Sequence, residues 1–91
     1  MKPDTASKAW SVEVLLEETG DETKAEALLE LRGDRLVGSG RARRNPQDPA
    51  IPRIGEELAT ARALGELAHK LLDVAATEIE EYEGTPVTPH A

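Results

Sequence analysis

Three prolines within seven residues, Pro46, Pro49 and Pro52, separate two parts of the chain that have different periodicity. Proline has no amide hydrogen and restricts the residue before it, so neither a helix nor a strand ladder is expected to run through this segment. We therefore predict an extended connector over residues 44–52. Before it, apolar and polar residues alternate, and after it nothing interrupts a helix as far as residue 83.

The alternation before the connector predicts three strands, at residues 9–17, 24–32 and 35–43. Glycine and acidic residues between them are typical of tight turns. Alanine and glutamate make the middle segment equally suitable for a helix, but its short length and the turns on both sides favour a strand. Strands joined by such short turns are antiparallel neighbours, so the sequence predicts a three-stranded antiparallel β-meander.

Pro52 suits the first position of a helix, and we predict one over residues 53–83. Apolar or small residues recur there at alternating spacings of four and three, which predicts one buried face. Its members are Ile54, Leu58, Ala61, Gly65, Ala68, Leu72, Ala75, Ile79 and Tyr82, and Leu64, Leu67, Leu71 and Val74 widen it. Because the middle of this face is small and the third strand carries Gly38 and Gly40, helix and sheet are expected to approach closely, with Trp10 filling one end of the layer.

These segments predict one α+β domain over residues 9–83, in which the meander packs on a single long C-terminal helix. Residues 1–8 and 84–91 are short and polar or proline-punctuated, so we expect them to be flexible tails. The chain has no cysteine, and no stretch approaches the length needed to cross a bilayer. We therefore expect a cytoplasmic protein with no disulfide and no membrane partner.

The lengths of the predicted elements do not match. A helix of about 30 residues spans about 45 Å, whereas strands of about nine residues span about 28 Å. Part of the helix should extend past the sheet, and the outer sheet face also carries apolar residues among its charges. A homodimer would cover both surfaces, although scattered surface leucines are a simpler alternative. The interface candidates are Leu15, Leu28, Val37, Leu72, Ile79 and Tyr82.

The residue types offer little for catalysis. His69 is the only histidine inside the predicted domain, and no nucleophile with a base and an orienting group can be assembled around it. The glutamates of the strands fall on the outward side, and those at the helix end lack a histidine or a fixed loop for a metal. The segment from Gly38 to Arg41 does not lead directly into a helix, as a phosphate loop must. We expect no catalytic site, metal, cofactor or small-molecule substrate.

The formal net charge of -7 opposes non-specific binding to nucleic acid. The positive charge is concentrated, however, because five arginines and only one acid, Asp48, lie between residues 35 and 53. The candidates for contacting an anion or an RNA backbone are Arg41, Arg43, Arg44 and Arg53. Pairing of these arginines with the acidic excess across the sheet is the alternative, and the net acidity favours it.

Four segments carry a family resemblance: WSVEV at 10–14, TKAEALL at 23–29, GSGRARRNPQD at 38–48 and IPRIGEELATARAL at 51–64. In this order they resemble an actinobacterial family of small proteins of unknown function with a fold like that of double-stranded RNA-binding domains (dsRBD-like). The resemblance covers about residues 9–80. It implies the β-β-β-α fold, induction of some members in hypoxia or dormancy, a likeness in shape to ribosome hibernation-promoting factors, and dimers formed through the sheet.

Two functions follow as expectations. The first is a stress- or dormancy-associated regulator that binds the ribosome or another RNA–protein complex through the four candidate arginines. The second is a homodimeric protein–protein interaction module that binds no nucleic acid. The sequence departs from double-stranded RNA-binding domains where the final helix begins, because Arg53 is followed by Glu56 and Glu57, which repel phosphate.

Overall fold

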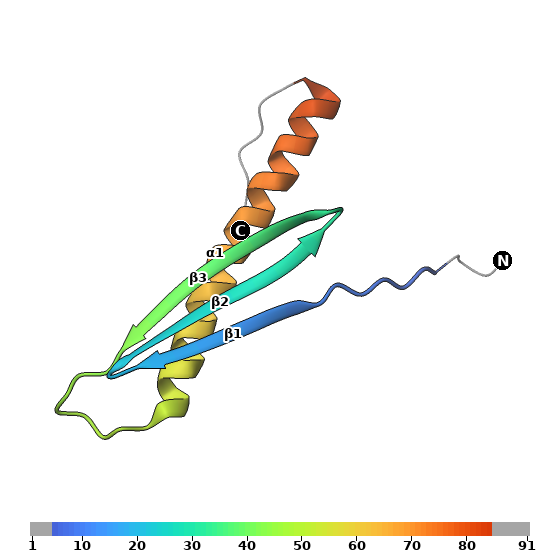
Figure 1. The fold of residues 1–91 in the computed structure, drawn as a ribbon. Coiled ribbons are helices and arrows are strands. Elements are labelled where there is room, and N and C mark those ends of the chain that lie inside the picture. Colours follow the sequence, from blue (N-terminus) through green and yellow to red (C-terminus); the bar gives the residue numbers. More distant parts are fainter. Residues whose placement is uncertain (1–4, 85–91) are drawn as a thin grey trace.

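The structure, a computed structural model, describes residues 5–84. Its elements are β1 (Val12–Thr19), β2 (Glu22–Leu31), β3 (Asp34–Arg43) and α1 (Pro52–Glu83). The strands form one antiparallel sheet in the order β1-β2-β3, and α1 crosses one face of it (Figure 1). The predicted α+β fold class, a three-stranded meander followed by one long helix, is confirmed. Of the two predicted tails, residues 1–4 and 85–91 lie outside the described residues.

The two hairpin turns explain where the strands begin and end. Thr19 pairs with Glu22, which leaves only Gly20 and Asp21 as the first turn. β1 therefore runs to Thr19 instead of stopping at residue 17, and it begins at Val12, so the prediction of a strand from residue 9 was wrong. The second turn is Arg32 and Gly33, both with positive φ, 52° and 86°. Two consecutive residues with positive φ form the tight turn that matches the twist of a hairpin.

The core lies between α1 and the sheet and is built largely from alanine. Its members are Ala25, Ala27, Leu29, Ala42, Ala59, Ala63 and Leu67, with Val14, Leu36 and Leu71 partly buried beside them. A methyl group buries little apolar area, so each of these alanines contributes less hydrophobic free energy than a leucine would. The stability of this core depends on how closely the two layers approach.

Two glycines of β3 permit that close approach. A Cβ added at Gly38 would fall 2.5 Å from the amide nitrogen of Leu67, and one added at Gly40 would fall 2.5 Å from that of Ala63. The backbone of α1 therefore lies directly on the backbone of β3. The predicted close approach of helix and sheet is present, but it involves Ala59, Ala63 and Leu67 instead of Ala61, Gly65 and Ala68.

The central line of the helical face predicted to be buried is mostly exposed, and this part of the prediction was wrong. Its exposed members are Ile54, Leu58, Ala61, Gly65, Ala68, Ala75, Ile79 and Tyr82. Of the residues that widen the face, Leu67 is buried and Leu71 and Val74 are partly buried. The face that meets the sheet instead contains Ala59, Ala63 and Leu67 at spacings of four. The glycines of β3 select this face because only a methyl group fits between the two backbones at Ala59 and Ala63. Trp10 is 60% exposed and does not fill the end of the layer, since the ladder begins only at Val12.

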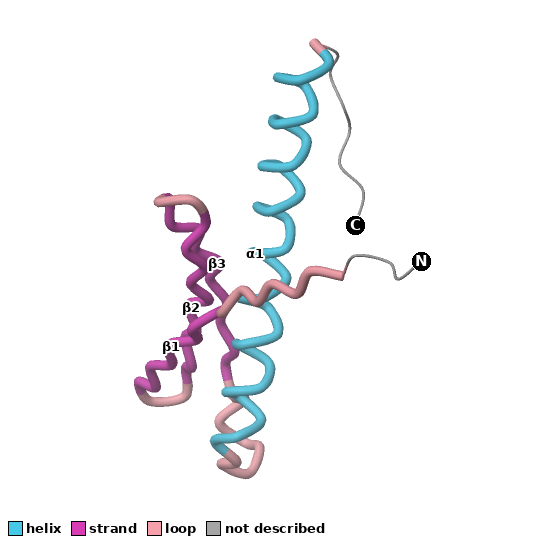
Figure 2. Tube along the Cα trace, turned by 90° about the vertical axis from the view of Figure 1, so that its right-hand side faces the viewer, coloured by secondary structure: helices cyan, strands magenta, loops and turns pink. Residues whose placement is uncertain are grey.

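Helix and sheet form two layers, and α1 continues past the β2–β3 turn at its C-terminal end (Figure 2). Arg32 in that turn reaches the extended part of the helix, where its Nη1 donates to Glu78 Oε1 at 2.8 Å. α1 packs mainly on β3 and β2 and barely touches β1. The inner face of β1 is therefore largely left without a helix above it. Within residues 5–84, no helix is both long and apolar enough to cross a membrane.

Candidate interaction surfaces

Arg44 is tied into the connector. Its Nη2 donates to Asp21 Oδ1 at 2.6 Å, and its Nη1 donates to the backbone carbonyls of Asn45, Pro46 and Asp48. Its amide also donates to the carbonyl of Asp21 at 2.8 Å. The guanidinium therefore holds the connector against the β1–β2 turn, and most of its donors are already used.

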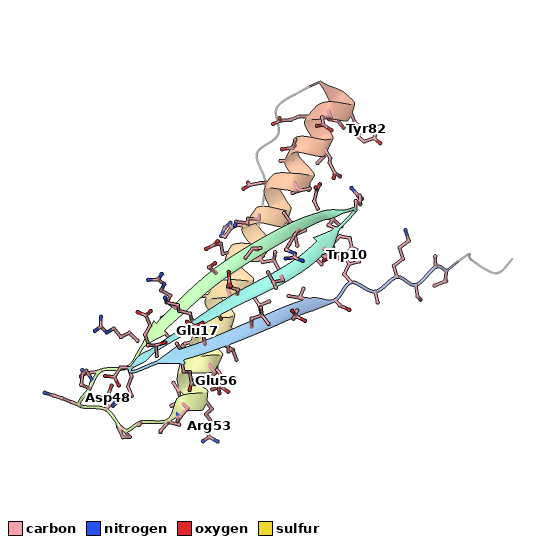
Figure 3. The ribbon with its side chains drawn as sticks, viewed as in Figure 1. Trp10, Glu17, Asp48, Arg53, Glu56 and Tyr82 are labelled. Atoms are coloured by element: carbon pink, nitrogen blue, oxygen red, sulfur yellow. The ribbon has the colours of Figure 1, made fainter. Side chains whose placement is uncertain are left out.

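Arg41 and Arg43 lie two residues apart on β3 and therefore share the outer face of the sheet, the side away from α1. Arg41 stands in one row with Lys24 and Glu17, and Arg43 stands in another with Glu22. Arg43 thus has an acid directly beside it, whereas Arg41 has Lys24 beside it and its acid, Glu17, one strand further away. Arg53 belongs to the first turn of α1 and lies near Glu56 (Figure 3). The four candidate arginines come from three separate parts of the structure.

The outer face also holds three of the six dimer candidates. Leu28 lies directly opposite Val37, and Leu15 is a diagonal neighbour of Leu28. Leu28 and Val37 are partly buried, while Leu15 is 49% exposed. Charges surround this apolar group, with acids on β1 (Glu13 and Glu17) and arginines on β3. The face therefore carries a small apolar group beside Glu26 of β2, and its charge changes sign from β1 to β3.

The other three dimer candidates lie on α1 and belong to a different surface. Leu72 is partly buried, Ile79 is exposed, and Tyr82 in the last turn is 91% exposed. Figure 3 shows Tyr82 at the end of the helix that extends past the sheet. The six candidates are thus divided between the outer face of the sheet and the far end of α1.

A further apolar surface was missed by the sequence reasoning. We call it the β1 flank: Val12 and Leu16 on the inner face of β1, with Ala61 and Leu64 on the neighbouring side of α1. Val12, Leu16 and Leu64 are each more than 40% exposed. A shallow hollow in this flank is lined by Leu16, Glu56, Glu57, Thr60, Ala61 and Leu64. The alternation in β1 indicated an apolar face but not that α1 would leave it uncovered.

The two edges of the sheet differ. At β3, the Nη1 of Arg62 donates to the carbonyl of Arg41 at 2.6 Å, and the Nζ of Lys70 donates to the carbonyl of Val37. Both side chains come from α1 and bridge to the outer edge of this strand. Within residues 5–84, no such bridge reaches β1, whose only strand partner is β2.

Chemistry-bearing groups are sparse in the described part of the chain. His69 is exposed on α1. Among residues 5–84, no three histidine or acidic side chains are grouped in a way that could hold a metal ion. The absence of an enzymatic activity stays a prediction.

Comparison with known proteins gives a consistent set of matches. A family model described as Rv2632c-like matches residues 8–88. The uncharacterized protein Rv2632c of Mycobacterium tuberculosis is 42% identical over 81 residues, which cover 89% of this chain and 87% of that protein. The uncharacterized protein Mb1767 of Mycobacterium bovis is 40% identical over 83 residues, 91% of this chain and 88% of that protein. The crystal structure of Rv2632c matches with a TM-score of 0.84 and 38% identity, covering 92% of this chain and 100% of that one.

Proposed function

The chain belongs to the Rv2632c-like family, and from this premise we propose that it is a non-enzymatic protein–protein interaction module that acts as a homodimer. The relatives are mycobacterial, so the resemblance to an actinobacterial family of small proteins is confirmed. The proposal rests on one observation. The outer face of the sheet carries an apolar group, Leu15, Leu28 and Val37, with acids on the edge strand β1 and arginines on the edge strand β3.

The charges select one arrangement of two copies. A two-fold axis parallel to β2 would place β1 of one copy over β3 of the other, so that Glu17 faces Arg41 and Leu28 faces its own equivalent. The charged residues of β2 would also face their own equivalents, so the advantage of this arrangement comes from the two edge strands. A two-fold axis across the strands would instead place β1 over β1 and set Glu13 and Glu17 against other acids, which is unfavourable. We therefore propose the first arrangement.

The size of this face sets the expected affinity. Three strands of about ten residues offer a surface of about 14 by 33 Å, from the usual strand spacing and rise. Two such faces total about 900 Å², which is below the usual range for stable complexes and typical of weak ones. The dimer should therefore dissociate at low protein concentration instead of being permanent.

The arrangement of the arginines favours this function over ribosome or RNA binding. Arg44 already donates to four oxygen atoms of the connector and the β1–β2 turn. A phosphate approaching Arg43 would also approach Glu22 on the next strand, and one approaching Arg41 and Lys24 would meet Glu17 in the same row. The stress- or dormancy-associated role at the ribosome is the alternative, and with Arg44 engaged in the connector it would depend on Arg41, Arg43 and Arg53 to bind phosphate.

Sedimentation velocity over a range of protein concentrations tests the dimer. Val37→Lys should give a monomer, because it buries a charge in the apolar centre. Arg41→Glu should weaken the dimer, and adding Glu17→Arg to it should restore association by exchanging the two charges. Wild-type protein that stays monomeric at the highest concentration, or Val37→Lys that dimerises normally, would refute the proposed interface.

Cosedimentation with 70S ribosomes across a salt series tests the alternative. The interaction module predicts no cosedimentation. Binding that weakens as salt increases, and that is lost in Arg41→Glu/Arg43→Glu, would favour the ribosome-directed role instead.

A further inference from the structure

β1 is the strand edge that the described structure leaves open. β3, the other edge, is bridged by Arg62 and Lys70 from α1. An edge strand presents a row of unpaired amides and carbonyls, which proteins usually cover or protect. β1 has eight residues, pairs along its whole length with β2, and has no bridging side chain among residues 5–84. Because β3 is protected and β1 is not, β1 is the candidate edge for strand addition.

The ladder identifies which amides of β1 point outward. The amide of Arg44 donates to the carbonyl of Asp21, so this pair belongs to the hydrogen-bonded set between β2 and β3. Hydrogen bonding alternates along each antiparallel strand, and a residue that bonds on one side does not bond on the other. The continuous register then directs Glu13, Leu15 and Glu17 toward β2. The backbone groups of the alternate residues, Val14 and Leu16 among them, face the open edge.

The β1 flank lies beside this edge. A strand added to β1 would continue the inner face of the sheet, and its inward side chains would meet Leu16 and the exposed side of α1 at Ala61 and Leu64. Because α1 barely contacts β1, the added strand would find an apolar surface above it and no helix in its way. Inward positions of the added strand should therefore be apolar.

The charges around the edge specify the outward positions. Glu13 and Glu17 lie on the outer face of β1, where the outward side chains of an added strand would be their neighbours. The hollow in the flank is lined by Glu56 and Glu57 and by no lysine or arginine. A second copy of this chain would bring its own Glu13 and Glu17 to the same place, so charge disfavours self-pairing here. Lysine or arginine fits instead.

We propose that the β1 edge binds an extended segment of a partner protein in which apolar residues alternate with lysine or arginine. The segment adds as a fourth strand, its backbone pairs with Val14 and Leu16, its apolar side chains cover the β1 flank, and its cations face Glu13 and Glu17. This is recognition by strand addition, in which backbone bonds give affinity and alternate side chains give specificity. The site uses the edge and the flank of β1, which the proposed dimer leaves open, and it shares only Glu13 and Glu17 with the outer face.

The test uses the full chain labelled with ¹⁵N and a synthetic capped peptide of about seven residues that alternates lysine and valine. The expected result is a set of amide shifts centred on β1, with slower hydrogen exchange at Val14 and Leu16. A peptide methylated on alternate backbone nitrogens should bind at least about tenfold more weakly, since two or more hydrogen bonds are lost. A peptide of the same composition with the valines and lysines in separate blocks should also bind more weakly.

Matched variants separate this site from general attraction to an acidic protein. In the Val37→Lys background, which removes the proposed dimer, Glu17→Lys should weaken binding of the peptide, whereas Glu81→Lys, the same charge change on an exposed part of α1, should leave it nearly unchanged. The proposal is overturned if the methylated peptide binds as well as the plain one, or if the shifts lie away from β1. It is also overturned if Val14 and Leu16 are already protected in a concentration-dependent way without peptide, because a second copy would then occupy the edge.

Discussion

Gly38 and Gly40 set the distance between the two layers of this molecule. Each lies under the backbone of α1, where a Cβ would come within 2.5 Å of an amide nitrogen. Real Cβ atoms are not found that close to backbone, so even alanine at these positions must push the helix away from the sheet. Gly65, by contrast, has open space around it on the exposed side of the same helix.

Gly40→Ala should therefore destabilise the protein by about 1–3 kcal/mol through overpacking. Gly65→Ala adds the same methyl group in open space and should stabilise the helix by about 0.5–1 kcal/mol. Urea unfolding at one fixed protein concentration measures both. Equal effects of the two substitutions would show that the close approach at Gly40 is not what limits the packing.

Arg44 illustrates how a residue suggested by charge can have a structural role. Arg44→Ala removes the hydrogen bonds to Asp21 and to the connector, and we expect a loss of about 1–2 kcal/mol in the free energy of unfolding. Arg43→Ala removes an exposed guanidinium of the outer face and should change stability by less than about 0.5 kcal/mol. The two variants are compared by thermal melts at high salt, because salt screens the surface charges that would stabilise the proposed dimer. Similar melting temperatures for the two variants would contradict the bracing role of Arg44.

At the scale of elements, the sequence pattern predicted the type and order of the strands and the helix correctly, but it did not predict correctly which face of the helix is buried. Period two and the turn residues were enough for the meander, and the prolines were enough for the start of the helix. α1, however, carries two overlapping stripes, and periodicity favoured the one with larger residues, from Ile54 to Tyr82. The stripe that packs is the one that fits two glycines of β3, which depends on the distance between layers and not on hydrophobicity.

The candidate surfaces could be predicted only where they depend on the alternation within one strand. Alternation placed Leu15, Leu28 and Val37 on the outer face, and the register shows that Leu28 and Val37 are neighbours. The open flank of β1 could not be predicted, because it depends on α1 lying over β2 and β3. The clustering of arginines along the chain likewise did not indicate that Arg44 would form hydrogen bonds to the connector.

The bridges from α1 to β3 lead to a prediction about this edge. The double variant Arg62→Met/Lys70→Met removes both side-chain donors and keeps much of their apolar stems. We expect the freed edge of β3 to accept another strand, so that larger species appear in sedimentation velocity as concentration rises. Arg53→Met serves as the control for loss of a positive charge. A profile identical to that of wild type would show that these bridges do not protect the edge.

For the whole molecule, a core of mostly alanine gives modest stability to one copy, and association should contribute part of the total. The melting temperature should rise by about 3–5 °C for each tenfold increase in protein concentration if unfolding is coupled to dimer dissociation. Val37→Lys should remove this dependence without changing the melting temperature at the lowest concentration by more than a few degrees. A wild-type melting temperature that is independent of concentration would argue for a monomer that folds alone.

The difference between the two sheet edges also decides how far assembly can proceed. Growth of a fibre by strand addition needs every subunit to offer two complementary edges, one to receive the last unit and one to receive the next. Here α1 already bonds two outward carbonyls of β3, so this edge has fewer free backbone groups than β1. If a partner segment adds at β1 as proposed, α1 should oppose the addition of a further strand at β3, and assembly should stop at one added segment.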